Sequence, residues 1–317
     1  MEVVGVVAAV LSSTLGGTSI GATRYLAGML DPLAIGVFRF GIGGALLLPF
    51  ALLQGAGWPR RQDWPGVVAL GLLFFGLFPI LFNAALIYTT AARGALALST
   101  LPLLTMLTAA LLRVEPLGLR KAAGVLIAMA GVAIALVSGL ADAPVGAWRG
   151  DLLMVTAAFC MALYSVWSRP FIARSGPIPF TTMAMAAGAA GLTVVSLQQN
   201  SFAPLHGFGP GPWIALFYLG LFGGALAFWL WAYALRHTTP TRVAVSVTVN
   251  PIAASLVGAT ILREPLHWQV GLGLLGVFGG IWIAMSEGGA PRSPGAVQKV
   301  LVTLDSVRGR SGSRWRA

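Results

Sequence analysis

The stretch that decides the fold is TTAARGALALSTLPLLTMLTAALLRVEPLGLRKAAGVLIAMAGVAIA, from Thr89 to Ala135. A shift of 149 positions aligns it, without a gap, on residues 238–284. The shift pairs Thr89-Thr90 with Thr238-Thr239, Arg93 with Arg242, Pro102 with Pro251, Glu115-Pro116-Leu117 with Glu264-Pro265-Leu266, Gly124 with Gly273 and Gly131 with Gly280. A repeat of this length indicates a duplicated domain, so it is identified before any single element is assigned.

The composition predicts an integral membrane protein. Of the 317 residues, 57% are hydrophobic and only 9% are charged, and the mean hydropathy is +0.85. Soluble proteins carry about 25% charged residues, so this chain cannot cover a surface that faces water. The net charge of +11 does not indicate nucleic-acid binding, because the basic residues are scattered between apolar runs rather than gathered in a patch. The lipid bilayer is therefore the expected partner.

The apolar runs predict an all-α fold of ten membrane-spanning helices. Each such helix needs about 20 mostly apolar residues. The segments that qualify are roughly 3–22, 33–53, 65–87, 92–112, 118–138, 151–168, 178–197, 212–235, 240–262 and 268–286. Pro-containing or Gly-containing turns separate most of them, as at Asp31-Pro32, Glu115-Pro116 and Gly176-Pro177.

The duplication extends over nearly the whole chain. Trp64 aligns with Trp213 at the same shift of 149, and Gly5 aligns with Gly150 at a shift of 145. Residues 1–140 and 149–286 are therefore predicted to be two copies of one five-helix unit. The remaining residues, 288–317, form a basic tail rich in Gly, Pro, Ser and Arg, for which we expect either disorder or a short interfacial helix.

An odd number of helices in each copy predicts that the second copy is inverted relative to the first. Cytoplasmic loops carry an excess of Lys and Arg. With the N-terminus inside, the inner segments hold Arg60, Arg61, Arg113, Arg120, Lys121, Arg169, Arg174, Arg236 and Arg242, and the outer ones hold Arg24, Arg93, Arg149 and Arg263. We therefore expect both termini on the cytoplasmic side of the inner (plasma) membrane.

These features resemble the EamA-type transporters of the drug/metabolite transporter superfamily. The resemblance covers residues 1–286 and includes Tyr88-Thr89-Thr90, the segment 162–169 (ALYSVWSR) and Phe38-Arg39. It implies a central solute pathway lined by helices 1, 3, 4, 6, 8 and 9. One difference is that Leu15-Gly16-Gly17-Thr18 stands where members of the family often have a tryptophan midway along the first helix.

Pro102 and Pro251 interrupt matching helices, and interrupted helices at a repeat interface commonly form the binding site of such carriers. We expect these two prolines to approach each other near mid-membrane and to line the pathway with the neighbouring polar side chains. Those side chains are Ser99, Thr100, Thr105, Ser246, Thr248 and Asn250. The alternative is that the prolines only kink packed helices and that Ser and Thr bond back to their own helix.

Arg39 is the only charged residue well inside a predicted helix, which makes it a candidate for holding a substrate carboxylate. It could instead extend to the interface or bind Asp31. Further pathway candidates are Asn83, Tyr88, Tyr164, Trp167 and Tyr233. Tyr88 and Trp167 lie near helix ends, where anchoring at the membrane interface is the alternative.

The acidic residues limit the substrate classes. All nine lie at or beyond the ends of predicted helices, and the three histidines lie in loops. No carboxylate is therefore expected at mid-membrane to bind a cationic drug, and no metal or cofactor site is expected. Glu115 and Glu264 precede a proline at a helix start, which favours a cap over a coupling site. Gly271 to Gly276 match the dinucleotide-binding pattern G-x-G-x-x-G but lie inside a predicted apolar helix, so this segment is not predicted to bind a dinucleotide.

The predicted function is that of a secondary transporter, an exporter or facilitator rather than an enzyme. Its expected substrate is an amino acid or another neutral, zwitterionic or anionic solute, moved by alternating access at a central cavity. The main alternative is efflux of drug-like compounds. A membrane scaffold has no need for matching interruptions in both copies, and an intramembrane lipid enzyme would need clustered acids, histidines or a nucleophile, which the sequence lacks.

Overall fold

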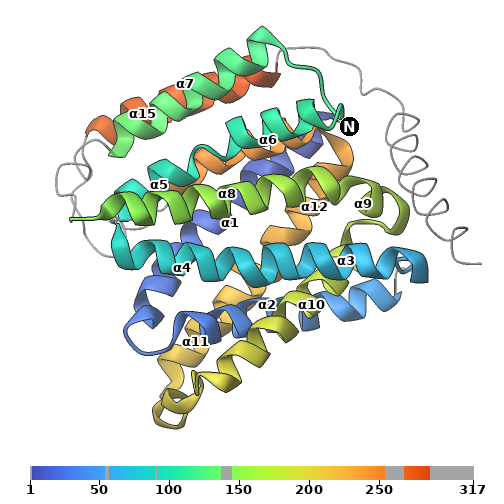
Figure 1. Cartoon of the computed structure of the whole chain (residues 1–317), viewed down its shortest axis with the longest axis vertical. Helices are drawn as coiled ribbons and strands as arrows, with labels where there is room; N and C mark the ends of the chain where they lie inside the picture. The colour runs from blue at the N-terminus through green and yellow to red at the C-terminus, as the bar shows by residue number, and fades with distance from the viewer. Residues whose placement is uncertain (1, 54–56, 90, 137–144, 254–267, 286–317) are drawn as a thin grey trace, which may run out of the picture.

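The computed structural model describes residues 2–53, 57–89, 91–136, 145–253 and 268–285. Every regular element within these ranges is helical. The expectations for Glu264-Pro265 and for the tail from residue 288 concern residues outside them. Figure 1 shows the helices side by side, with α7 and α15 together along one edge.

The elements follow the predicted order of apolar segments. The first predicted copy contains α1 (Glu2–Ala27), α2 (Pro32–Leu53), η1 (Arg61–Asp63), α3 (Trp64–Gly71), η2 (Leu72–Leu77), α4 (Phe78–Tyr88), α5 (Ala91–Leu98), α6 (Leu101–Leu111) and α7 (Leu119–Leu136). The second contains α8 (Ala147–Trp167), α9 (Arg169–Ser175), α10 (Pro177–Gln198), η4 (Ala203–Gly207), α11 (Pro210–Tyr218), η5 (Leu219–Leu226), α12 (Ala227–His237), α13 (Pro240–Val245), η6 (Ser246–Val249) and α15 (Trp268–Met285). The predicted segments 33–53 and 178–197 lie within one residue of α2 and α10.

Six helical segments are long and apolar enough to cross a membrane. They are Glu2–Ser19, Pro32–Leu53, Arg61–Ala85, Ala147–Trp167, Pro177–Gln198 and Pro210–His237. Two shorter apolar segments, Leu96–Leu111 and Gly271–Ala284, lie in the regions of the fourth and tenth predicted helices. The all-helical, membrane-spanning character is therefore confirmed, whereas the number of ten spanning helices stays a prediction.

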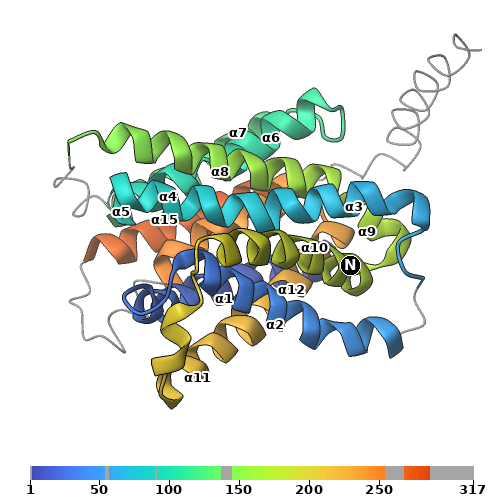
Figure 2. The same cartoon turned by 60° about the horizontal axis from the view of Figure 1, so that its bottom comes forward.

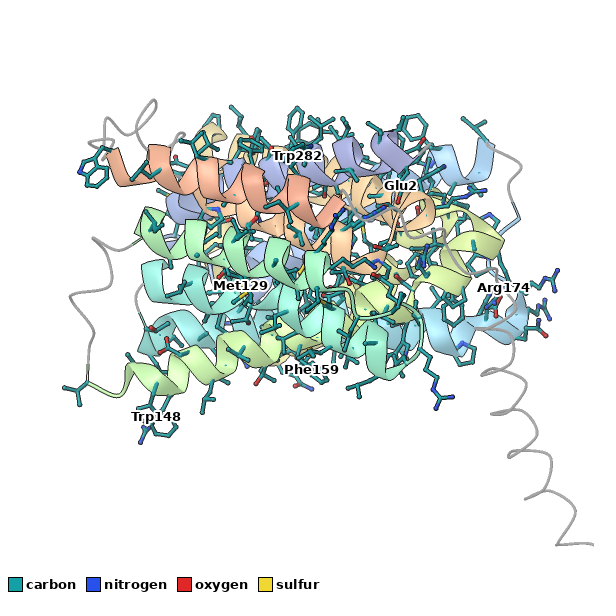
Figure 3. The ribbon with its side chains drawn as sticks, turned by 90° about the horizontal axis from the view of Figure 1, so that it is seen from above. Glu2, Met129, Trp148, Phe159, Arg174 and Trp282 are labelled. Atoms are coloured by element: carbon teal, nitrogen blue, oxygen red, sulfur yellow. The ribbon has the colours of Figure 1, made fainter. Side chains whose placement is uncertain are left out.

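Large apolar side chains cover the outer surface of the bundle. Leu111 is 83% exposed, and Leu275 and Trp282, two turns apart on α15, are 70% and 73% exposed. Figure 3 shows Trp282 and Phe159 on opposite outer faces. A protein surrounded by water rarely exposes such surface on several sides. Lipid is the solvent that suits it.

Both proline-containing helices are interrupted just before the proline. Ser99 and Thr100 form a turn between α5 and α6, and the 3-10 turn η6 separates α13 from Asn250-Pro251. A proline removes a backbone donor and disfavours helical geometry in the residue before it. The equivalent interruptions therefore follow from the equivalent prolines.

Two π-helical stretches also occupy equivalent positions. A shift of 149 aligns η2 with residues 221–226, which lie inside η5. Each stretch begins beside a glycine at a close helix crossing. A Cβ atom on Gly71 would overlap the backbone of Ala184 in α10, and one on Gly220 would lie 2.5 Å from Cβ of Ile42 in α2. Single-turn π-helical segments are often found at functional sites.

The equivalent helices α7 and α15 pack against each other in opposite directions. Gly124 faces Gly280 and Ala284, whereas Gly131, further along α7, faces Gly273 near the start of α15. A Cβ on Gly131 would lie only 2.8 Å from the carbonyl oxygen of Gly273. Small residues that allow backbones to approach closely are the usual basis of helix packing in membranes.

The other contacts between the two predicted copies come in matching sets. α1 packs against α12, and α8 packs against α4, as Figures 1 and 2 show for α4 and α8. At one end of the first pair, a Cβ on Gly5 would lie 3.4 Å from Cβ of Thr238. At the equivalent end of the second, a Cβ on Gly150 would lie 2.7 Å from Cβ of Thr89. The equivalent helices α2 and α10 also pack against each other.

The neighbouring glycines Gly279 and Gly280 provide a test of the α7 and α15 interface. A Cβ on Gly280 would lie 2.5 Å from the backbone of Ala128, whereas one on Gly279 meets nothing within 4 Å. We expect Gly280→Ala to lower the free energy of unfolding by about 1–3 kcal/mol, because overpacking strains both backbones. Gly279→Ala should be neutral or slightly stabilising. Equal melting temperatures of the two variants in detergent would contradict the interface.

Candidate functional site

Hydroxyl side chains of α1 contact three other elements. The Ser12 hydroxyl donates to the carbonyl of Ala227 in α12 at 2.7 Å. The hydroxyl oxygens of Ser13 and Ser246 in η6 lie 2.9 Å apart. Tyr218 at the end of α11 donates to the Thr18 hydroxyl at 3.1 Å. The sequence analysis did not select these hydroxyl residues, although they recur along Ser12-Ser13-Thr14 and Thr18-Ser19 and this recurrence could have indicated them.

The hydroxyl groups at the helix interruptions donate to their own backbone. Ser99 donates to the carbonyl of Leu96 at 2.6 Å, and Ser246 donates to that of Val243 at 2.7 Å. Ser246 also contacts the carbonyl of Ala9 in α1 at 3.1 Å. Both serines are buried. Their hydroxyl groups thus donate back to their own helix, which is the alternative considered from the sequence.

Pro102, Asn250 and Pro251 lie at or beside buried positions of the bundle. Pro102 is buried at the start of α6. The buried cluster that contains Val249 and Ile252, on either side of Pro251, is also contacted by Leu103. A Cβ on Gly16 of α1 would lie 3.3 Å from the amide nitrogen of Asn250. The predicted approach of the two prolines stays a prediction.

The amide oxygen of Asn250 is buried and has no hydrogen-bond partner among the described residues. The same holds for the indole N–H of Trp231 in α12 and the hydroxyl of Thr105 in α6. A buried polar group without a partner costs about 1–3 kcal/mol. These three atoms are therefore candidates for contact with a solute.

Arg39 connects α2 to the π-helical stretch of the other copy. Its Nε donates to the carbonyl of Gly223 in η5 at 3.0 Å, and its guanidinium carbon lies 5.9 Å from the ring centre of Phe228. Asp31 does not bind it, because the carboxylate of Asp31 accepts the backbone N–H of Leu33. No acidic side chain in the described part of the chain forms an ion pair with Arg39.

Tyr164 lies in an aromatic cluster rather than beside a hollow. Its side chain is 1% exposed and stacks on Phe74 of η2, with ring centres 4.4 Å apart. Phe75 and Phe180 pack around it. Tyr233 in α12 is half-buried, and its ring centre lies 4.1 Å from that of His237, with the two rings tilted. Both rings therefore contribute to packing in this conformation.

Among the predicted pathway residues, Tyr88 and Trp167 are exposed and Asn83 is partly exposed. Asn83 is partly exposed on α4, and Tyr88 at the end of that helix is 43% exposed. Trp167 at the end of α8 is 46% exposed. These last two positions also suit aromatic anchors at a membrane interface, the alternative considered from the sequence.

Glu115 caps a different helix from the one that the sequence suggested. It precedes α7, yet its Oε1 accepts the backbone N–H of Thr241 at the start of α13, at 3.1 Å. Its Oε2 pairs with Lys121 at 3.1 Å. Burial lowers the pKa of the nearby Arg169 guanidinium, and the negative charge of Glu115 opposes that shift. Glu115 therefore joins the two predicted copies.

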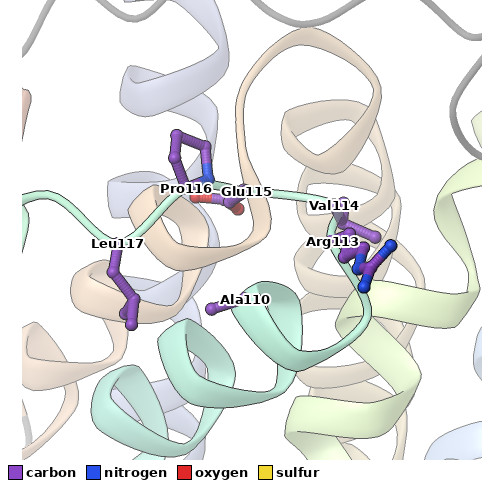
Figure 4. A pocket seen from close by; sticks show the side chains of 6 residues that line it. All are labelled: Ala110, Arg113, Val114, Glu115, Pro116 and Leu117. Atoms are coloured by element: carbon purple, nitrogen blue, oxygen red, sulfur yellow. The ribbon is translucent and has the colours of Figure 1, made fainter.

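The surface hollows formed by the described residues include two of similar volume. One of about 300 Å³ lies beside Glu115 and is lined by Ala110, Arg113, Val114, Glu115, Pro116 and Leu117, as Figure 4 shows. The other, of about 320 Å³, is an apolar groove between α1 and α15. Neither is lined by Arg39, Asn250 or the two prolines. No group of three or more potential metal ligands occurs in the described part of the chain.

Comparisons with known proteins agree with this arrangement. A relative from Bacillus subtilis (strain 168), named "Uncharacterized transporter YyaM", is 25% identical over 77% of this chain and 82% of its own length. A "Probable terminal-alkyne amino-acid exporter" from Streptantibioticus cattleyicolor is 29% identical over 69% of this chain and 73% of its own length. A solved crystal structure shares the fold with a TM-score of 0.75, covering 90% of this chain and 98% of its own at 24% identity.

The sequence pattern of one family matches the chain twice. The EamA-like transporter family aligns with residues 3–137 and again with residues 148–286. These two stretches account for most of the chain. With its apolar, membrane-spanning helices, this protein therefore belongs to the EamA-like transporter family.

Proposed function

We propose that this protein is a secondary carrier of the inner (plasma) membrane that moves an amino acid or a similar small zwitterionic or anionic metabolite. Transport would occur by alternating access between two inverted five-helix copies. The observation that carries the substrate class is Arg39, a cation inside a membrane-spanning helix with no acidic partner among the described residues. Intramembrane charges of this kind commonly mark substrate pathways.

The pattern of helix contacts supports the inverted repeat. The equivalent helices α7 and α15 run antiparallel, and Gly36 and Gly44 of α2 face Leu192 and Met185 of α10 in the same antiparallel sense. Equivalent segments that run in opposite directions are what a two-fold axis in the membrane plane produces. With the excess of basic residues in the expected inner segments, this supports both termini on the cytoplasmic side.

Arg39 and Asn250 both lie near the same stretch of α1, where they provide a donor and an acceptor for the substrate. The amide oxygen of Asn250, which lies against Gly16, needs a donor. One helical turn further along α1, Ser19 and Arg39 both lie against Gly223. Gly16 and Ser19 are roughly 4.5 Å apart along the helix axis. The guanidinium would hold a carboxylate and Asn250 an ammonium group, which lie close together in an α-amino acid.

The equivalent region of the other copy is filled by aromatic rings. There, Tyr164 stacks on Phe74, whereas at the equivalent positions Ser19 lies against Gly223. By sequence alignment, the filled half holds Phe74, Phe75, Tyr164 and Ala184, and the polar half holds Gly223, Gly224, Ser19 and Arg39. Of these eight residues, the glycines and the cation occur on one side only. We therefore assign the substrate-binding role to the side formed by α1, α2 and η5.

The remaining predicted residues have secondary roles in this proposal. Pro102 and Pro251, with Ser99 and Ser246, would maintain the helix interruptions where the copies meet. Asn83, Tyr88, Trp167 and Tyr233 would line the approaches to the site. Acidic residues among the described helices lie near helix ends, as Asp63, Glu115 and Asp151 do. This distribution disfavours cationic substrates, which need a carboxylate well inside the membrane-spanning part of the pathway.

Solute uptake into proteoliposomes tests the function directly. We expect the purified protein to exchange or transport at least one neutral or acidic amino acid from a panel that also includes amines, sugars and cationic dyes. A preference for carboxylates follows from Arg39 as the only cation that lies well inside a described candidate span, away from its ends. Transport of cationic dyes alone would instead favour drug efflux, and failure to move any solute would refute the carrier.

Arg39→Gln tests the carboxylate contact. We expect a roughly tenfold to hundredfold rise in KM for an amino acid, because a charge-assisted hydrogen bond is lost. The KM for the corresponding amino-acid amide, which has no carboxylate, should change little. Arg39→Lys, which keeps the charge and a donor, is the matched control and should retain part of the preference. Equal losses for the acid and the amide would indicate a structural role for Arg39.

Tyr164→Phe and Tyr164→Ala distinguish packing from solute contact in the aromatic half. We expect Tyr164→Phe to keep both the melting temperature and the transport rate, because the ring stack on Phe74 remains. Tyr164→Ala should lower the free energy of unfolding by roughly 3–5 kcal/mol through the cavity that it leaves. A stable Tyr164→Phe protein without transport would show that the hydroxyl contacts the solute.

A further inference from the structure

Each of three acidic residues in the first copy binds a group of the second copy. Glu2 pairs with Arg242, Asp63 with Arg174, and Glu115 with the backbone N–H of Thr241. All three contacts lie at the same end of the molecule. The contacts of Glu2 and Glu115 are neighbours, because Arg242 follows Thr241 directly in the sequence. Figure 3 shows Glu2 and Arg174 towards one end and Trp148 at the other.

Glu115 forms the most buried of these contacts. Its side chain is 4% exposed and that of its partner Lys121 is 7% exposed. One carboxylate oxygen binds Lys121 and the other binds Thr241, so both oxygens are satisfied. Removal of the charge at such a site leaves a buried Lys121 without its partner, which is costly. The contact therefore holds the end of α6 firmly against the start of α13.

Asp63 and Arg174 form a two-pronged contact nearer the surface. The guanidinium donates to both carboxylate oxygens, at 3.1 and 2.8 Å. Arg174 also lies over the ring of Phe171, 5.0 Å from its centre. This pair joins the start of α3 to α9, the link between α8 and α10. Paired, planar contacts of this type give geometric specificity as well as energy.

The ion pairs at this end are not repeated residue for residue at the aligned positions. The sequence shifts of 149 and 145 align Asp63 and Arg174 with Pro212 and Met29, Lys121 with Val270, and Glu2 with Ala147. In each pair at least one charged partner is therefore missing. That end keeps the charges of Arg93, Glu264 and Asp151, and Asp151 accepts a hydrogen bond from Thr89 at 3.0 Å.

We propose that Glu2, Asp63 and Glu115 form an ionic closure, which shuts the solute pathway at the Glu2 end in the resting conformation. The proposal rests on the carrier function, because the joined elements include the ends of helices expected to line the pathway. Given cytoplasmic termini, the closure lies on the cytoplasmic side. The copies must separate at this end during transport, so the three contacts break together.

Thiol accessibility tests the closure. The reporter is Ala9→Cys in a Cys160→Ala background, because Ala9 is fully buried and roughly 10 Å along α1 from Glu2. A membrane-impermeant maleimide is applied from the Glu2 side of sealed vesicles, and labelling of the exposed Arg113→Cys identifies that side. We expect Glu115→Gln to speed labelling of the reporter at least about tenfold, because the closed state loses its most buried ion pair.

Two matched controls separate the closure from general destabilisation. Arg120→Gln removes a neighbouring exposed charge and should leave labelling unchanged. Asp63→Arg should speed labelling by like-charge repulsion, and adding Arg174→Asp should restore slow labelling because the pair forms again with its charges exchanged. Rescue of this kind requires a folded protein.

The outcomes also separate this proposal from the carrier function, because labelling needs no substrate. Unchanged labelling in both Glu115→Gln and Asp63→Arg, with normal transport, would overturn the closure alone. Fast labelling of the parent protein from the Glu2 side would do the same. If the purified protein moves no solute, the carrier function fails, whatever the labelling shows. Faster labelling in the variants, reversed by charge exchange, supports the closure.

Discussion

Carbonyl groups freed inside a bilayer must find a donor within the protein, and much of this structure follows from that constraint. Lipid offers no hydrogen bonds, and an unpaired amide group there costs several kcal/mol, of the order of 4–8 in hydrocarbon. Ser99 and Ser246 each add a hydroxyl donor to a carbonyl beside a helix interruption, and that carbonyl also accepts a backbone N–H. Arg39 supplies one to Gly223 in the π-helical stretch of the other copy. Side chains that look functional in the sequence therefore also maintain the backbone.

The same constraint explains what could be predicted from the sequence. Apolar runs of fixed length and prolines in matching positions have local signatures, so the helices and their interruptions were predictable. The partner of Arg39 was not, because Gly223 lies 184 positions away, and no residue preference distinguishes a π-helical stretch from an α-helix. Ser99 and Tyr164 were selected for their chemistry, yet one bonds to its own helix and the other packs among aromatic rings. Only tertiary contacts decide between such alternatives.

Duplication gives the two halves similar backbones without giving them similar interiors. Gly5 meets Thr238 as Gly150 meets Thr89, so the helix crossings are preserved. Between those crossings the side chains have diverged, and the stack of Tyr164 on Phe74 corresponds to Ser19 against Gly223. Close approach of two backbones at the helix crossings requires glycine, so few substitutions are tolerated there. Between the crossings, large and small side chains can be exchanged more freely. One half can therefore provide rigid packing while the other provides polar groups.

The ion pairs between the copies fit the energetic requirements of a reversible transition. Two conformations exchange readily only if their free energies differ by a few kcal/mol. Glu2 is half exposed and Arg174 is about a third exposed, although their partners Arg242 and Asp63 are only 3% and 11% exposed, so water reaches one member of each pair. Glu115 is buried and would cost more to break, unless water reaches both it and Lys121 once the copies separate. A closure made of charges can be hydrated when it opens, which an equally strong apolar contact cannot. Charged groups are therefore well suited to an end that must open and close repeatedly.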